Sequence, residues 1–124
     1  MQTPLPGKSV RGFRTGRPIM ALLDLLGRRW ILRILWELRE EGLGFRGLQE
    51  RCGRMSSSVL SQRLRDLANA GIVEQDAGGD YGLTAPGGRL LAALLPVYHW
   101  AEEWARSAGG ARRKRTNSRP GVQR

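Results

Sequence analysis

Residues 54–80, RMSSSVLSQRLRDLANAGIVEQDAGGD, decide the fold. Ser56 is a good N-cap, because its side-chain oxygen can accept a hydrogen bond from a free backbone N–H at the start of a helix. Gly71 supplies the stop, because glycine readily adopts the left-handed conformation that ends a helix. Between them, apolar residues recur at helical spacing, at Val59, Leu60, Leu64 and Leu67. The stretch therefore predicts an amphipathic helix over residues 56–69 with one face buried.

A helix before this one and a hairpin after it complete the pattern. The spacing of Phe45, Leu48 and Cys52 predicts a short helix that Gly53 closes, so a turn at residues 53–55 joins two helices. Downstream, strands are predicted at residues 72–77 and 81–84, around a two-residue turn at Gly78-Gly79. Two helices joined by a turn and followed by a hairpin are typical of a winged helix-turn-helix.

Three further helices are predicted around this centre. The first covers residues 19–26, begins after Pro18 and stops at Gly27. The second begins at Arg28, ends at residues 40–42, and has one apolar face formed by Ile31, Ile34, Leu35 and Leu38. The last covers residues 89–108, and Pro96 either kinks it or splits it in two. The predicted fold class is mainly α with a small β-hairpin.

Positive charge is concentrated at the two ends of the chain. The formal net charge is +10, yet residues 1–17 hold four basic side chains, residues 106–124 hold seven, and neither stretch has an acid. The remaining residues carry ten basic and eleven acidic side chains. The composition predicts a flexible basic arm at residues 1–17, a folded domain at 18–108 and a disordered basic tail at 109–124. Such ends either bind a polyanion or are merely solvated.

The exposed side of the helix at 56–69 carries the residue types that bind DNA. The major groove admits one α-helix, and reading base edges requires side chains with hydrogen-bond donors and acceptors. Predicted base-reading residues are Ser57, Ser58, Ser61, Gln62 and Arg65. Predicted contacts to the DNA backbone come from Arg29, Arg54, Ser56 and Arg63. For Arg63, an internal ion pair near Asp66 is an equal alternative, and the helix alone would fit an ordinary surface helix.

The chain resembles the HxlR-type winged helix-turn-helix transcriptional regulators. The segments that carry the resemblance are RPIMALLDLLGRRWILRILWEL, FRGLQERCGRMSSSVLSQRLRDLANAGIVEQ, and YGLTAPGGRLL with the residues up to Trp100. The resemblance implies a bacterial, cytoplasmic and nucleoid-associated homodimer that binds a pseudo-palindromic operator in double-stranded DNA, as a repressor and not an enzyme. It implies a dimer interface on the first and last helices, with Ile19, Leu22, Leu23, Leu26, Trp100 and Trp104.

Four features depart from this family pattern. Arg17 stands where many relatives have the cysteine that serves redox-sensing members, so a thiol switch is excluded at that position. Cys52 replaces an aliphatic residue, and a small core residue is the favoured interpretation over a sensor. The predicted turn is acidic, with Asp76 and Asp80, where relatives commonly have a longer basic wing. Arg28-Arg29 replaces Gly-Lys, and Arg29 could touch a phosphate.

Other functions have little support in the sequence. No nucleophile elbow, phosphate loop or paired catalytic carboxylates are visible, and the single His99 has no neighbour that would complete a metal site. No cofactor is expected, and no stretch is apolar enough to span a membrane. Trp100 and Trp104 could line a pocket for an unidentified small-molecule effector with Tyr98 and His99. Two alternatives remain: a non-specific nucleic-acid binder driven by the basic ends, and a winged helix used for protein contact.

Overall fold

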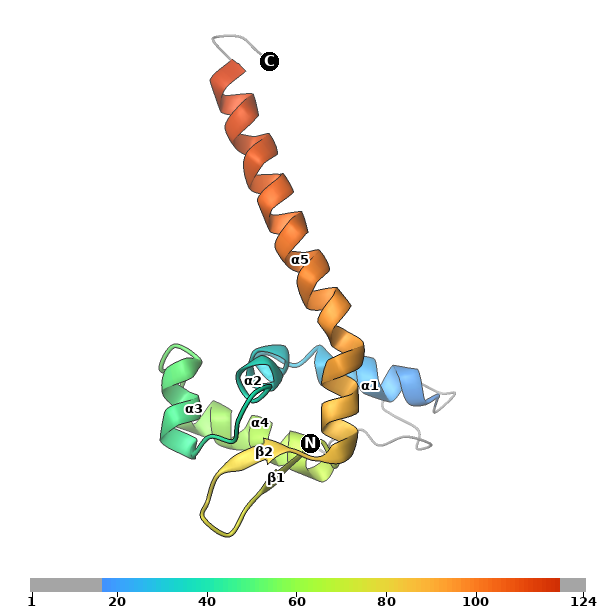
Figure 1. Ribbon diagram of the computed structural model, residues 1–124, viewed down its shortest axis with the longest axis vertical. Coiled ribbons are helices and arrows are strands. Elements are labelled where there is room, and N and C mark those ends of the chain that lie inside the picture. The colour runs from blue at the N-terminus through green and yellow to red at the C-terminus, as the bar shows by residue number, and fades with distance from the viewer. Residues whose placement is uncertain (1–16, 119–124) are drawn as a thin grey trace. The chain divides into compact units, whose positions relative to one another are not determined.

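The computed structural model describes residues 17–118, with side chains through residue 109, and contains five helices and one hairpin in that range (Figure 1). The element order is α1 (Pro18–Leu26), α2 (Ile31–Glu37), α3 (Phe45–Arg51), α4 (Ser57–Asn69), β1 (Val73–Gln75), β2 (Tyr81–Leu83) and α5 (Ala85–Ser118). The chain divides into two units after Leu91, and the first unit contains the helix-turn-helix and the hairpin. The predicted class, mainly α with a small hairpin, is confirmed.

The core is built from the apolar positions that the sequence places at helical spacing. Ile31, Ile34 and Leu35 of α2 are fully buried, and so are Leu60 and Leu67 of α4. The other buried apolar residues are Ala21, Leu25, Leu38, Leu48, Cys52, Met55, Leu64, Ile72, Val73 and Leu91. These residues come from all five helices, from β1 and from the connections between elements, and burial of each large apolar side chain contributes about 1.5–3 kcal/mol.

The second helix begins later than the sequence predicts. Arg28, Arg29 and Trp30 form a turn, and α2 starts at Ile31. Trp30 has a φ of 80°, which is left-handed and incompatible with a helix interior. The prediction was wrong because the apolar spacing itself starts only at Ile31, so nothing in the pattern required Arg28 to be helical.

The turn between α3 and α4 is held by two left-handed residues and one side-chain hydrogen bond. Gly53 and Arg54 have φ values of 73° and 60°. Gln49 donates from Nε2 to the carbonyl oxygen of Met55 at 2.8 Å, and Met55 is buried. Ser56 caps α4 as predicted, because its Oγ accepts a hydrogen bond from the backbone N–H of Val59.

The hairpin has shorter strands and a longer loop than predicted. β1 and β2 pair in antiparallel register with Val73 opposite Leu83 and Gln75 opposite Tyr81. The loop covers residues 76–80, so it is longer than the predicted two-residue turn. It is folded around Asp76, whose Oδ1 accepts hydrogen bonds from the backbone N–H groups of Gly78 and Asp80, each at 2.9 Å. An aspartate that folds the backbone around its own carboxylate is a common alternative to a tight Gly-Gly turn.

The start of α5 is fixed against the end of the α4–β1 connection. Thr84 Oγ1 donates toward the carbonyl oxygens of Gly71 and Ile72 at 2.6 and 3.1 Å, and it accepts from the backbone N–H of Gly87. Gly87 is buried, and a Cβ atom there would overlap the Ile72 carbonyl oxygen. The first turn of α5 can lie this close to the backbone only because position 87 is a glycine.

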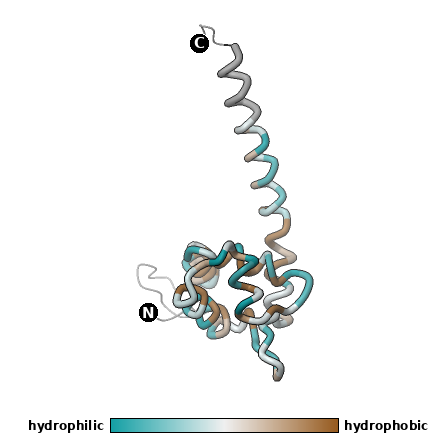
Figure 2. The backbone as a smooth tube through the Cα atoms, turned by 90° about the vertical axis from the view of Figure 1, so that its left-hand side faces the viewer, coloured by the Kyte–Doolittle hydropathy of each residue, from teal (hydrophilic) through white to brown (hydrophobic). Residues whose placement is uncertain are grey.

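The helix α5 is longer than predicted at both ends. It begins at Ala85, and Pro86 lies in its first turn, where a missing N–H costs nothing. It continues through Pro96, so the helix is not split there, and it extends past Gly109, where the basic tail was predicted to begin. Once a helix is formed, each further residue adds a hydrogen bond, which offsets the weak propensity of glycine. In the coloured part of α5, the tube changes from mostly hydrophobic to mostly hydrophilic toward residue 109 (Figure 2).

Candidate nucleic-acid interface

The first turn of α4 presents serine hydroxyls to solvent. Ser56, Ser57 and Ser58 are exposed, and the hydroxyls of Ser56 and Ser58 lie 3.1 Å apart. Ser56 Oγ accepts the capping hydrogen bond and Ser58 pairs with Ser56, and all three side chains remain open to solvent. The helix is thirteen residues long and buries its opposite face through Leu60, Leu64 and Leu67.

Three of the predicted base-reading residues contact each other. Arg65 is exposed, and its Nη1 donates to Ser61 Oγ at 3.2 Å while its Nη2 donates to Gln62 Oε1 at 2.9 Å. Gln62 in turn donates from Nε2 to Asp66 Oδ1 at 3.0 Å. Ser61, Gln62, Arg65 and Asp66 therefore form one hydrogen-bonded chain, which we call the α4 relay.

The buried end of the α4 relay is a carboxylate held by two arginines. Asp66 is only 1% exposed, and its Oδ2 lies 3.1 Å from Arg28 Nη1 and 3.2 Å from Arg63 Nη1. Arg28 also pairs with Asp24 of α1 at 3.2 Å. Burying a charge is costly unless it is paired and hydrogen-bonded, and these contacts satisfy that requirement. We call Asp24, Arg28, Arg63 and Asp66 the Asp66 cluster.

Arg63 makes the internal ion pair that was one of its two predicted alternatives. Its guanidinium pairs with Asp66, and its Nε donates to the carbonyl oxygen of Arg29 at 2.8 Å. Arg63 therefore connects α4 to the turn before α2, and the internal ion pair is the alternative that the structure contains. Among residues missed by the sequence prediction, Asp66 and Arg28 are the most consequential. The available signal was a lone acid three residues after Arg63 and one after Arg65, directly before the apolar Leu67.

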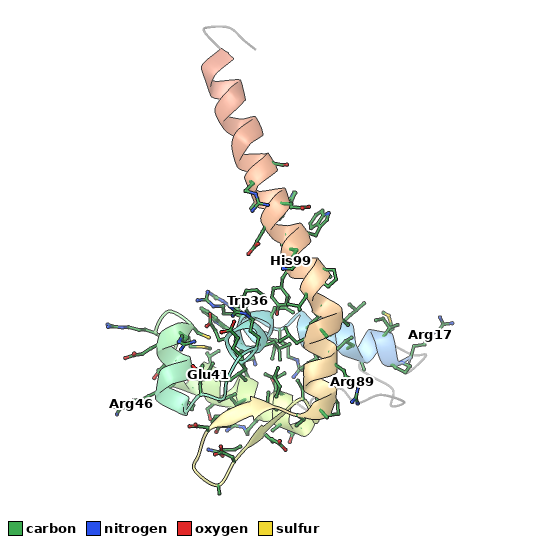
Figure 3. All side chains as sticks on the ribbon, viewed as in Figure 1. Arg17, Trp36, Glu41, Arg46, Arg89 and His99 are labelled. Carbon is green, nitrogen blue, oxygen red and sulfur yellow. The ribbon has the colours of Figure 1, made fainter. Side chains whose placement is uncertain are left out.

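The other residues predicted to contact the DNA backbone are more open. Arg29 is exposed, with its guanidinium carbon 5.5 Å from the centre of the Trp30 ring. Arg54 is exposed at the left-handed position of the helix-turn-helix turn. Arg46, which the sequence prediction did not include, extends outward from α3 (Figure 3) and is also exposed. These three guanidinium groups are accessible cations in the stretch from the turn before α2 to the turn before α4.

A second ion-pair network reduces the free positive charge on α2 and α3. Arg33 Nε lies 2.8 Å from Glu37 Oε2, and its Nη2 donates to the Arg51 carbonyl oxygen at 2.7 Å. Arg51 itself lies 3.8 Å from Glu37 and 3.4 Å from Glu41.

Cys52 is buried beside this network, and burial is the main cause that raises the pKa of its thiol above the ordinary value. A buried, protonated thiol fits the prediction of a core residue.

The hairpin loop is acidic where it is exposed. Asp76 and Asp80 flank it, and both residues are exposed even though Asp76 folds the loop backbone around its carboxylate. Neither side chain favours a phosphate group, because like charges repel. The loop itself therefore offers little to a polyanion.

Exposed apolar side chains lie on α1 in the first unit and on the part of α5 that belongs to the second unit. In α1, Ile19 and Leu23 are more than half exposed, while Leu22 and Leu26 are half-buried. In α5, Trp100 and Trp104 stack with ring centroids 5.7 Å apart, and each is 60% exposed. Large exposed apolar groups in such clusters mark interaction surfaces.

Within residues 17–118, no group of three or more histidine, cysteine or acidic side chains is placed to hold a metal ion. Over the same described residues, no helix combines the length and the apolar character needed to cross a membrane.

Comparison with known proteins agrees with this geometry. The family model described as HxlR-like helix-turn-helix matches residues 25–108. The chain belongs to this family. An HTH-type transcriptional regulator of Bacillus subtilis, YvaP, is 31% identical over 88 residues, which cover 66% of this chain and 82% of YvaP.

Solved structures of HxlR-like and related regulators have the same fold. Quinone-bound YodB from B. subtilis is 29% identical, with a TM-score of 0.63 over 68% of this chain and 94% of that chain. A protein from Thermoplasma volcanium, described as a possible HxlR family transcriptional factor, is 28% identical, with a TM-score of 0.64 over 68% of this chain and 82% of that chain. The protein is therefore an HxlR-like transcriptional regulator with a helix-turn-helix DNA-binding domain, and not an enzyme.

Proposed function

We propose that this HxlR-like regulator represses transcription as a homodimer that binds a pseudo-palindromic operator with α4 in the major groove. The observation that carries the proposal is the two-sided character of α4. One side is buried through its leucines, and the other presents Ser57, Ser58 and the exposed Arg65 from a capped helix. Uncharged hydroxyls and an arginine fork are the groups that read base edges.

Phosphate contacts are assigned to the exposed arginines and to the cap of α4. Arg29, Arg54 and Arg46 are exposed guanidiniums, and Ser56 lies at the helix N-terminus, where backbone N–H groups attract a phosphate. Arg63 is assigned a different role, because its contacts with Asp66 and with the Arg29 carbonyl oxygen lie within the protein. We assign it to holding the turn before α2 against α4.

The dimer is proposed to form through the exposed apolar residues of α1 and α5. Ile19, Leu23, Trp100 and Trp104 are each more than half exposed in the single chain. A symmetric partner that covers them would remove this apolar surface from water, at about 25 cal/mol per Å². Half-sites would then lie one helical turn of DNA apart, about 10 bp, or a multiple of it. Such a protein would act on the nucleoid, in the cytoplasm of a bacterium.

The charge distribution favours one alternative, a non-specific nucleic-acid binder driven by the basic ends. Seven basic residues lie at positions 106–124, whereas the chain between the two basic ends is close to neutral. Under this alternative the winged-helix domain would not bind DNA itself and would only connect the two basic ends. Counterion release would then supply nearly all the affinity, without sequence preference.

A competition assay separates the two functions. The full chain is bound to a labelled duplex that carries the preferred site, and random-sequence DNA is added in excess at physiological salt. A specific regulator keeps its site, because specific binding is typically 10³-fold or more tighter than non-specific binding. Loss of binding in proportion to the added random DNA supports the alternative. A chain ending at residue 109 is the matched control, because it removes basic residues without touching α4.

A further inference from the structure

The α4 relay assigns different roles to two residues that the sequence treats as equivalent. We infer that Arg65 reads a guanine, while Gln62 is a positioning residue that Asp66 holds with its amide nitrogen turned away from the groove. The inference rests on the proposed function, because it requires α4 to read base edges. It makes Gln62 and Asp66 determinants of specificity without contact to a base.

The orientation of the Gln62 amide follows from the chemistry of Asp66. An ionised carboxylate only accepts hydrogen bonds, so the group of Gln62 that faces it must be the NH₂. The observed contact is Nε2 to Asp66 Oδ1 at 3.0 Å. Gln62 is also half-buried, in contrast to the exposed Arg65. A glutamine that reads adenine needs both its amide oxygen and its nitrogen at the base edge, and here the nitrogen is committed to Asp66.

The orientation of Gln62 then fixes Arg65. With its nitrogen on Asp66, Gln62 turns Oε1 toward Arg65 Nη2 at 2.9 Å, while Ser61 Oγ accepts from Nη1 at 3.2 Å. A guanidinium has five N–H donors, so these two contacts leave donors free for the O6 and N7 atoms of a guanine. Holding a long side chain in place before binding reduces the conformational entropy that binding costs.

The charge of Asp66 is maintained by the rest of the Asp66 cluster. Arg28 and Arg63 lie 3.1 and 3.2 Å from Oδ2, and Gln62 contacts the other oxygen, Oδ1. Arg28 also pairs with Asp24 of α1. The conformation of Arg65 is therefore connected through side chains to α1, outside the helix-turn-helix.

The experiment is a double-mutant cycle measured as base preference. Full-length protein and the variants Gln62→Met, Arg65→Ala and the double variant are titrated against operator duplexes that each carry one changed base pair. Methionine matches the length of glutamine but makes neither hydrogen bond. We expect Arg65→Ala to lower discrimination for one guanine by roughly tenfold or more. Gln62→Met should lower discrimination at the same guanine about threefold, and it should have no further effect when Arg65 is already alanine.

Two results would overturn the inference and leave the proposed function intact. In one, Gln62→Met removes an adenine preference at another base pair, and does so equally in the Arg65→Ala background. In the other, Gln62→Met changes no base preference. If the unmodified protein shows no base preference at all, the proposed function itself is wrong, and the inference with it.

An Asp66 variant tests the buried end of the relay. Asp66→Asn should reduce discrimination at the guanine read by Arg65, and at no other base pair. A profile that changes at several base pairs, or at none, contradicts the assignment. If this variant does not fold, Gln62→Met decides the matter, because it leaves Asp66 paired with both arginines. Arg89→Lys on α5 is the control, because Arg89 is exposed, the substitution keeps its charge, and the residue lies outside the relay and outside the proposed phosphate contacts, so the base profile should stay the same.

Discussion

The close approach between α5 and the α4–β1 connection gives a sharp stability prediction for Gly87→Ala. The added methyl group would overlap the Ile72 carbonyl oxygen and lie 3.0 Å from its carbonyl carbon. The obstacle is backbone, which cannot rotate away as a side chain can. The first turn of α5 must therefore move away from Ile72, and with it the hydrogen bonds that fix this junction are strained.

The expected loss of stability can be estimated from these contacts. Forcing a methyl group into a packed site typically costs about 1–3 kcal/mol. The Ile72 carbonyl accepts from the backbone N–H and the hydroxyl of Thr84, at 3.0 and 3.1 Å, and each hydrogen bond contributes roughly 1 kcal/mol. Alanine regains up to about 1 kcal/mol of helix propensity over glycine. We therefore expect a net destabilisation of about 2–3 kcal/mol.

The neighbouring glycine provides a matched control. A Cβ atom at Gly88 would meet nothing within 4 Å, so Gly88→Ala should be neutral or stabilise by up to about 1 kcal/mol. Urea unfolding followed by circular dichroism should place the Gly87→Ala midpoint about 1–2 M below that of the unmodified chain. Equal midpoints for the two variants would refute the close approach between α5 and Ile72.

Further predictions concern the cap of α4, the buried thiol and the buried carboxylate. Ser56→Ala should lose about 1 kcal/mol in urea unfolding because the Val59 N–H loses its acceptor, whereas Ser57→Ala should stay within about 0.5 kcal/mol. Cys52 should react slowly with a thiol reagent at neutral pH until urea unfolds the chain, because burial raises its pKa; a fast reaction in the native state would contradict this burial. The pKa of this thiol is higher in the folded than in the unfolded chain, so its contribution to stability is present below its ordinary pKa and is lost as the pH rises through the raised pKa. Urea midpoints measured across that pH range should fall accordingly. Asp66→Ala should cost about 3–5 kcal/mol in the same assay, because it leaves two arginine side chains without their carboxylate, and a loss below 1 kcal/mol would mean that the cluster is not needed for folding.

Much of the fold follows from local patterns in the sequence. The leucine spacing in α4, the Ser56 cap and the stop near Gly71 fixed this helix to within a residue, because each depends on neighbours in the chain. The hairpin loop was mispredicted because two glycines suggested a tight turn, while the backbone is in fact folded around the carboxylate of Asp76. Local sequence did not reveal which of these competing turns would form.

The candidate site was less predictable for a physical reason. The residue types on the outer side of α4 were readable, but their hydrogen bonds to each other depend on rotamers that the sequence does not specify. The pairing of Arg28 with Asp66 joins segments far apart in the chain, so no helical spacing could indicate it. Arg63 pairs with Asp66 and donates to the Arg29 carbonyl oxygen, whereas the side chain of Arg29 is exposed, a difference that residue type alone does not indicate.

Selection of bound duplexes from a random DNA pool tests the central claim, that α4 of a symmetric dimer reads a specific sequence. The full chain is used at physiological salt, and the enriched sequences are aligned. We expect a palindromic consensus with half-sites about 10 bp apart or a multiple of it, containing a guanine that Arg65→Ala no longer selects. A pool that remains random after repeated rounds of binding would contradict sequence-specific reading by this helix.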